Sequence, residues 1–243
     1  MRSNNGHITT RTSLSRKRRR TNAYQGECFA RVGFLKTCAK LKDIRKGIKL
    51  HDDIRNRGLL HRSSLYLSNT LIDMYGKCGH LQNAYDIFEK LQDKDVVSWS
   101  AMMAGYSEHD RAEEALVCFQ RMQNEGILPD AFSFACILQA CSRIGYIDIG
   151  KRIHAEVRMA GLLKKNSVLA TTLVDMYAKC GCLGKAQEAF DELLTRDVVS
   201  WSALMNAYIQ HGFAEEALNC FRKMQNEGVI PNVITFTSAL KAC

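Results

Sequence analysis

Apolar residues in this chain recur at the spacing of amphipathic helices rather than of strands. Ala217, Phe221 and Met224 fall at i, i+4 and i+7, so they share one face of a helix. Gly126 and Gly228 stand where C-terminal caps are expected, and a proline that stops the helix follows each of them. The pattern predicts helical hairpins. First helices of about ten residues are expected to open at 175–180 and 201–208, with partner helices at 183–193 and 215–225.

The sequence repeats itself at an offset of 102 residues. Residues 95–100 recur identically at 197–202, and residues 73–79 recur at 175–181 with a single substitution. Three hairpins of 31 to 36 residues fit into each such unit. A hairpin of this size cannot bury its apolar face alone, so neighbouring hairpins must stack. We therefore expect an all-α fold, an α-solenoid of tandem helix-turn-helix repeats that winds into a right-handed superhelix.

Two families of helical repeat have this period: the tetratricopeptide type, which binds peptides, and the pentatricopeptide type, which binds single-stranded RNA. The segment Val96-Val-Ser-Trp-Ser-Ala-Met-Met, followed by Gly126-Ile-Leu-Pro-Asp130, closely resembles the pentatricopeptide P motif. Asp73-Met-Tyr-Gly-Lys-Cys-Gly79 resembles its short S variant, and Gly150-Lys-Arg-Ile-His154 resembles the longer L variant. The order of the motifs resembles that of the PLS subfamily of plant organellar RNA-binding proteins.

This resemblance implies six repeats after a basic, disordered N-terminal segment at 1–27. The repeats are expected at 28–64 (L), 65–95 (S), 96–130 (P), 131–166 (L), 167–197 (S) and 198–232 (P). Residues 233–243 would open a further L repeat and then stop, so a truncated repeat is expected there. A truncated, non-functional fragment is therefore one alternative interpretation of the chain.

In the pentatricopeptide family, the fifth and last residues of a repeat face the edge of one base. Here both positions carry short polar residues in every S and P repeat. Hydroxyls, amides and carboxylates can hydrogen-bond a Watson–Crick edge without filling the space that the base needs. The resemblance thus implies four base-reading pairs: Asn69 with Asp95, Ser100 with Asp130, Thr171 with Asp197, and Ser202 with Asn232.

The code of the family assigns U, G, G and A to these four pairs in chain order. With the L repeat between them unassigned, the expected target resembles single-stranded RNA of sequence 5′-UGNGA-3′. The L repeats place Val32 and Ala135 at the fifth position, and neither side chain can donate or accept a hydrogen bond. In the family, residues three before the fifth position sandwich the base, and these are Tyr66, Val97, Val168 and Val199.

Several of these positions also have a purely structural interpretation. Asp95, Asp130 and Asp197 could be N-caps of the helices that follow them, and the hydroxyl residues at the fifth positions could simply face solvent. The family resemblance favours base contact. Trp99 and Trp201 recur beside valines in a helix that must bury one side, which favours packing in the core over stacking on a base.

The histidines and the ten cysteines do not form the pattern of a metal site. His154-Ala-Glu156 matches the H-x-E fragment of zinc deaminases, but its repeat equivalent is His51-Asp-Asp53, and no P-C-x-x-C occurs. Most cysteines are phased with the repeat, which indicates small buried packing residues. No phosphate-binding loop or serine elbow is present. We therefore expect no metal, no cofactor and no catalysis, and a separate deaminase or other RNA-processing protein would supply any chemistry.

The net charge of +9 is concentrated near the N-terminus. Residues 1–26 hold seven basic residues and no acid, so the remaining 27 basic and 25 acidic residues give +2. A segment rich in Arg, Ser and Thr and free of acids is typical of an organellar transit peptide. The predominance of arginine favours the mitochondrion, with the chloroplast as the alternative and a nuclear signal less favoured. No apolar stretch is long enough to cross a membrane.

The predicted function is sequence-preferring binding of single-stranded RNA in an organelle. The protein would act in transcript editing, processing or stabilisation by positioning rather than by chemistry. The alternative from another class is a tetratricopeptide-like, peptide-binding adaptor. A peptide binder would more often carry Lys or Arg clamps at the positions that are uniformly short and polar here.

Overall fold

The computed structural model describes residues 26–62, 65–163 and 166–243, and within these ranges it contains helices and no strand. The helices form two compact units, residues 1–94 (unit 1) and 95–243 (unit 2). The all-α fold expected from the apolar spacing is confirmed. The basic segment predicted at 1–27 lies almost wholly outside the described residues.

The described part of unit 1 has a helix at residues 26–41, and four further helices follow it. These are α2 (Ile44–Asn56), the short α3 (Leu59–Arg62), α4 (Leu65–Lys77) and α5 (Leu81–Glu89). Helix α4 packs against α5 to form a hairpin, and α2 packs against α4. Nδ1 of His51 on α2 lies 2.9 Å from the hydroxyl of Tyr75 on α4, which joins these two helices.

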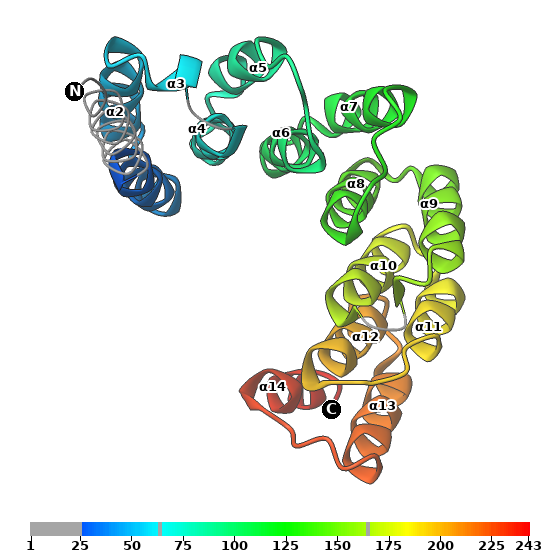
Figure 1. Cartoon of the computed structure of the whole chain (residues 1–243). Coiled ribbons are helices and arrows are strands. Elements are labelled where there is room, and N and C mark those ends of the chain that lie inside the picture. The colour runs from blue at the N-terminus through cyan, green and yellow to red at the C-terminus, as the bar shows by residue number, and fades with distance from the viewer. Residues whose placement is uncertain (1–25, 63–64, 164–165) are drawn as a thin grey trace, which may run out of the picture. The chain divides into compact units, whose positions relative to one another are not determined.

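Unit 2 consists of hairpins whose helices form two rows (Figure 1). In the row of first helices, α6 contacts α8, α8 contacts α10, α10 contacts α12, and α12 contacts α14. The second helices, α7, α9, α11 and α13, each pack against the first helix that precedes them. The bounds are α6 (Val96–Glu108), α7 (Ala112–Asn124), α8 (Ala131–Ile144), α9 (Ile147–Met159), α10 (Ser167–Lys179), α11 (Leu183–Asp191), α12 (Val198–Gln210), α13 (Ala214–Asn226) and α14 (Val233–Lys241).

Gly126 and Gly228 end α7 and α13, as the sequence predicted. Their φ angles are +75° and +76°, in the left-handed region that glycine enters without strain. After α7, the N–H of Gly126 bonds to the carbonyl of Gln123, and the N–H of Ile127 reaches back to the carbonyl of Met122. These bonds satisfy carbonyls that the end of the helix would otherwise leave without a donor.

The first helices are longer than predicted and begin earlier. Helices α10 and α12 have 13 residues each, and residues 175–180 lie at the end of α10 rather than at its start. Asn166, which the prediction did not consider as a cap, and Asp197, which it did, accept hydrogen bonds from the N–H groups of Leu169 and Ser200 and so begin these helices. The partner helices α11 and α13 agree with the predicted ranges to within two residues at each end.

The core of each hairpin is closed by large side chains that recur with the repeat. Trp99 and Trp201 are 0% and 2% exposed, which confirms that they pack in the core rather than stack on a ligand. The ring of Trp201 meets that of Phe190 edge-on, with centroids 4.6 Å apart. In unit 2, the hydroxyl of Tyr177 bonds to Nδ1 of His154 at 2.9 Å, in the same way as the pair in unit 1.

The cysteines fit the predicted role as small packing residues only in part. All ten are free thiols, and Cys38, Cys118, Cys136, Cys141 and Cys220 are buried. Cys78 and Cys180 are only half-buried, and Cys243 is exposed.

Candidate functional site

The predicted last residues of the repeats are N-caps of first helices. Asp130, Asp197 and Asn232 begin α8, α12 and α14, and Asp95 begins α6. In each case the side chain accepts a hydrogen bond from the N–H three residues later, and that residue's hydroxyl meets the capping residue's own N–H. The structural interpretation of the aspartates is therefore confirmed. Capping occupies Oδ1 of each side chain and fixes how the side chain is turned.

Ser100 and Asp130 are brought together by a third residue, Ser133. Ser100 lies on α6 and is 3% exposed, whereas Asp130 begins the neighbouring helix α8 and is exposed. The hydroxyl oxygens of Ser100 and Ser133 are 2.7 Å apart, and Ser133 donates to Oδ1 of Asp130 at 2.8 Å. The predicted pair is thus joined by a short relay of hydrogen bonds between adjacent hairpins.

Thr171 and Asp197 are also joined through one residue, Ser167. Thr171 donates to the carbonyl of Ser167 at 2.7 Å, and the hydroxyl of Ser167 bonds to the Asp197 side chain. Partial burial acts to raise the pKa of Asp197. The hydrogen bonds from the N–H of Ser200 and the hydroxyl of Ser167 outweigh it, so the pKa of this carboxyl lies below its usual value. Asp197 is therefore an anion at neutral pH.

Ser202 and Asn232 lie on helices that pack against each other, α12 and α14. Ser202 is 7% exposed and donates to the carbonyl of Val198 at 2.6 Å. Asn232 is exposed, and its Oδ1 accepts from the N–H of Thr235 at 3.0 Å. This pair is held by two separate local bonds rather than by a shared residue.

Asn69 and Asp95 belong to different units, so each is described by itself. Asn69 is on α4 in unit 1 and is 5% exposed. Asp95 is half-buried at the start of α6 in unit 2, where Oδ1 accepts from the N–H of Ser98 at 2.8 Å. Asp95 is thus held by the helix that it begins.

A groove of about 410 Å³ lies over α8, α10 and α12 in unit 2. Three of the predicted residues line it: Thr171, Val199 and Ser202. Its lining includes neither Ser100 nor any capping residue. Polar side chains further along the same helices complete most of the wall, and these are Gln139, Thr172, Asp175, Asn206 and Gln210.

The four predicted sandwiching residues are all exposed, although they are apolar. Each is the second residue of a first helix, and the exposed fractions are 47% for Tyr66, 52% for Val97, 68% for Val168 and 57% for Val199. Exposed apolar side chains at one position of every such helix are not needed for packing. They are available to contact a ligand.

Phe132 was not among the predicted site residues, although it is the second residue of α8 and is 56% exposed. The predicted sandwiching residues came only from repeats whose fifth residue can hydrogen-bond a base, and Ala135, the fifth residue of this L repeat, cannot. Val32 and Ala135 are indeed buried, at 4% and 8% exposed. The repeat register could have identified Phe132, since it aligns with Val97, Val168 and Val199.

The groove residues Asp175 and Asn206 were also not predicted, although each lies one helical turn after a predicted fifth residue.

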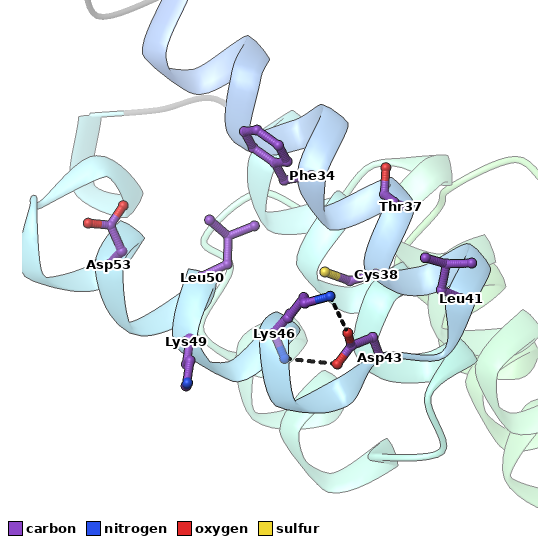
Figure 2. Close-up of a pocket in the computed structure, with 9 residues that line it drawn as sticks. All are labelled: Phe34, Thr37, Cys38, Leu41, Asp43, Lys46, Lys49, Leu50 and Asp53. Carbon is purple, nitrogen blue, oxygen red and sulfur yellow. Dashed lines mark hydrogen bonds and ion pairs between the residues drawn. The ribbon is translucent and has the colours of Figure 1, made fainter.

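A second pocket, of about 530 Å³, lies in unit 1 between the helix at 26–41 and α2 (Figure 2). Phe34 and Leu41 line it on one side and Leu50 on the other, and Asp43 pairs with Lys46 at its rim. The repeat equivalents of Phe34 and Thr37 are Ile137 and Ala140, both fully buried on α8. In unit 2, α6 and α7 pack against α8. The pocket therefore lies on the surface of this hairpin that corresponds to a buried packing surface in unit 2. It contains none of the predicted site residues.

Within the described ranges, no group of three His, Cys, Asp or Glu side chains is placed to hold a metal ion. His154, the residue of the H-x-E fragment, is 7% exposed and bonded to Tyr177, so it serves the core. Burial raises the pKa values of the Cys136 and Cys141 thiols to about 12, which keeps both protonated. In the same ranges, no helix has the length and apolar character needed to span a bilayer.

Comparison with known families finds the same motif in both halves of the chain. The PPR repeat family matches residues 94–143 and 196–243, and the PPR repeat matches residues 66–96 and 168–198. Together these segments cover more than half of the sequence. The chain belongs to the pentatricopeptide repeat family. The matches thus separate it from the tetratricopeptide repeats that share its period.

Relatives of this pentatricopeptide repeat protein are found in Arabidopsis thaliana. A mitochondrial pentatricopeptide repeat-containing protein is 38% identical over 212 residues, which cover 87% of this chain and 38% of the relative. A chloroplastic one is 38% identical over 214 residues, which cover 87% of this chain and 28% of the relative. The chain therefore spans less than half the length of these relatives.

Among solved structures, the pentatricopeptide repeat protein PPR10 of maize, in complex with an 18-nucleotide psaJ RNA element, has a TM-score of 0.67 to this chain. The two are 23% identical, and the similarity covers 81% of this chain and 29% of PPR10. At this level of identity the comparison establishes a shared fold, the helical repeat of the pentatricopeptide solenoid.

Proposed function

We propose that this pentatricopeptide repeat protein binds single-stranded RNA with sequence preference and acts in organellar RNA metabolism. It would act by occupying a defined stretch of transcript in editing, processing or stabilisation. The relay from Ser100 through Ser133 to Asp130 is the observation that carries this proposal. It places a hydroxyl and a carboxylate from adjacent hairpins side by side, with the carboxylate exposed.

The surroundings of this pair support the proposal. Val97 and Phe132 are exposed at the starts of the two helices that carry the pair, and they offer apolar surface against which a base can stack. Thr171 and Asp197, in the next S hairpin, are also joined through one residue, Ser167. One polar pair and one exposed apolar residue per step is the arrangement needed to read an extended strand base by base.

The proposed target is 5′-UGNGA-3′. Asn69 and Asp95 would read U, and this assignment rests on the sequence alone. Ser100 with Asp130 and Thr171 with Asp197 would each read G, and Ser202 with Asn232 would read A. The unassigned base N falls to the L repeat at 131–166, whose fifth residue is the buried Ala135.

The chain would supply recognition and no catalysis, and a separate deaminase or other RNA-processing protein would act on the bound transcript. The buried His154 and the protonated thiols favour this assignment, because none of them is poised as a nucleophile or base. The PLS subfamily and the mitochondrion are the proposed class and location. Both mitochondrial and chloroplastic relatives exist, so an organelle is supported more firmly than the choice between the two.

Binding of the full chain to labelled RNA, measured by fluorescence anisotropy, tests this function. We expect 5′-UGNGA-3′ to bind more tightly than the versions with C at either G, by roughly three- to tenfold per change, because each change removes donors from a charged acceptor. Equal binding of all these RNAs would contradict the base assignment. No measurable binding to any of them would contradict RNA binding itself.

A further inference from the structure

We propose that Ser133 is a positioning residue that sets which atoms Ser100 and Asp130 present to RNA. The inference rests on the proposed function, since it concerns the same base-reading pair. Ser133 lies in the first turn of α8, is fully buried, and contacts both members of the pair. A base cannot reach it, so its effect on recognition has to pass through its two partners.

The directions of these hydrogen bonds follow from the number of protons. A serine hydroxyl carries one proton, and Ser133 donates it to Oδ1 of Asp130 at 2.8 Å. The 2.7 Å contact between Ser133 and Ser100 must then use the proton of Ser100. Ser100 therefore donates into the protein and keeps only lone pairs for a ligand.

Asp130 likewise offers only an acceptor. Its Oδ1 receives the N–H and the hydroxyl of Ser133, both at 2.8 Å. Within the part of the chain that the structure describes, its Oδ2 has no hydrogen-bond partner, and the residue is exposed. The pair thus presents two acceptors and no donor, with Ser100 deeper and Asp130 nearer the solvent.

Two acceptors complement guanine better than adenine. The Watson–Crick edge of guanine has two neighbouring donors, N1–H and an N2–H. The edge of adenine has one donor, N6–H, beside the acceptor N1, so one acceptor of the pair would face a lone pair with no proton between them. By drawing the Ser100 proton inward, Ser133 favours G over A at this base.

The pair of Ser202 and Asn232 presents a donor in place of one of these two acceptors, for the same kind of reason. An amide nitrogen cannot accept, so the N–H of Thr235 must face Oδ1 of Asn232, which turns Nδ2 outward as a donor. Ser202 gives its proton to the carbonyl of Val198 and keeps lone pairs. One acceptor and one donor complement adenine, which agrees with the base proposed for this pair.

Ser200 provides a matched control for Ser133. It occupies the same position in the capping box of α12, but its hydroxyl exchanges hydrogen bonds with the backbone N–H and carbonyl of Asp197. The proton of Thr171 is taken by the carbonyl of Ser167 instead. Removing the Ser200 hydroxyl therefore weakens a helix cap without freeing the proton of the fifth residue in that pair.

The experiment compares Kd values of the full chain for 5′-UGNGA-3′ and 5′-UANGA-3′, with the same base at N and the same flanking sequence. In Ser133→Ala, the Ser100 proton loses its acceptor and becomes free to meet N1 of adenine. We expect the preference for G over A at the second base to fall at least threefold. Ser133→Cys keeps the side-chain volume but only a weak donor, so it should lower the same ratio even if the alanine variant folds poorly.

For Ser200→Ala, the ratio is measured at the fourth base, with 5′-UGNGA-3′ and 5′-UGNAA-3′, and we expect it to stay within twofold of the wild-type value. An unchanged ratio in folded Ser133→Ala or Ser133→Cys would overturn the inference, as would an equal loss in Ser200→Ala. If the wild-type chain binds none of these RNAs, the proposed function fails. If it binds and discriminates but Ser133 has no influence, only the positioning role fails.

Discussion

The hydroxyl of Tyr177 lies 2.9 Å from Nδ1 of His154 and joins α10 to α9. The same bond recurs in unit 1, where Tyr75 and His51 join α4 to α2 at the same distance. Burial lowers the pKa of His154 and raises that of Tyr177 to about 12. At neutral pH the tyrosine therefore keeps its proton and the imidazole is neutral, so two uncharged side chains form the contact between these helices.

This bond predicts that acid destabilises unit 2. The pKa of His154 is lower in the folded chain than in the unfolded chain. Its contribution to the free energy of unfolding is therefore fully present above about pH 6.5, the usual pKa of an unfolded histidine. The contribution declines as the pH falls below that value and is lost once the pH has passed the lowered pKa. The carboxylate of Glu192, whose Oε1 is 3.6 Å from Nε2 of His154, acts to raise the pKa of this histidine, but burial lowers it by more.

The variant His154→Asn keeps an acceptor and cannot take up a proton in this range. We expect thermal unfolding temperatures of the wild type to fall more steeply than those of this variant between pH 7 and pH 5. Measurement by circular dichroism in matched buffers would show the difference. Parallel curves for the two proteins would mean that His154 does not titrate on unfolding.

The capping residues predict a reciprocal exchange of base preference. In Asp130→Asn, the N–H of Ser133 holds Oδ1 and turns Nδ2 outward, so a donor replaces an acceptor. The second base of the target should shift from G toward A by roughly tenfold in relative affinity. Asn232→Asp should shift the fifth base from A toward G for the opposite reason. Competition binding with the four single-base variants measures both shifts, and a loss of affinity without a change of preference would count against the assignment.

Phe132 predicts a contribution to affinity that does not depend on the identity of the base. Its ring is 56% exposed at the start of α8, and it offers the unassigned nucleotide a surface to stack on. Phe132→Ala should weaken binding of all 5′-UGNGA-3′ RNAs by a similar factor, on the order of 1 kcal/mol. The unfolding temperature should hardly change, because the side chain is not in the core. A loss confined to one choice of N would indicate edge recognition instead.

Trp201 predicts the contrasting outcome. Its ring is 2% exposed and packs edge-on against Phe190. Trp201→Ala should lower the free energy of unfolding by about 3 to 5 kcal/mol, because it removes buried surface and leaves a cavity. Chemical denaturation measures this loss. Val199→Ala, two residues away but 57% exposed, is the control and should unfold like the wild type.

The repeat made much of the fold predictable. The identity of 95–100 and 197–202 shows that each hairpin is one copy of a unit, and the capping glycines mark where second helices end. The start of α10 was predicted too late because Asn166 was not considered as an N-cap, although the aspartates at the starts of other first helices were. The burial of Trp99 and Trp201 followed from the need of each helix to bury one side.

The candidate site was less accessible to sequence reasoning. Its pairs came from the resemblance to a family, and spacing alone does not show that Ser100 and Asp130 meet across two helices. Phe132 was not predicted because its repeat was assigned no base, since the fifth residue, Ala135, cannot form a hydrogen bond through its side chain. The link through Ser133 was also missed, because a serine in a capping box looks purely structural when only the sequence is read.

The sequence by itself determined the period, the helical hairpin and the identity of the short polar residues at each step, because these depend on local spacing and on side-chain chemistry. Only the tertiary structure decided which atoms those residues present. The proton of Ser100 is directed by a serine on the next hairpin, and that partner is chosen by how α6 and α8 pack rather than by their separation along the chain.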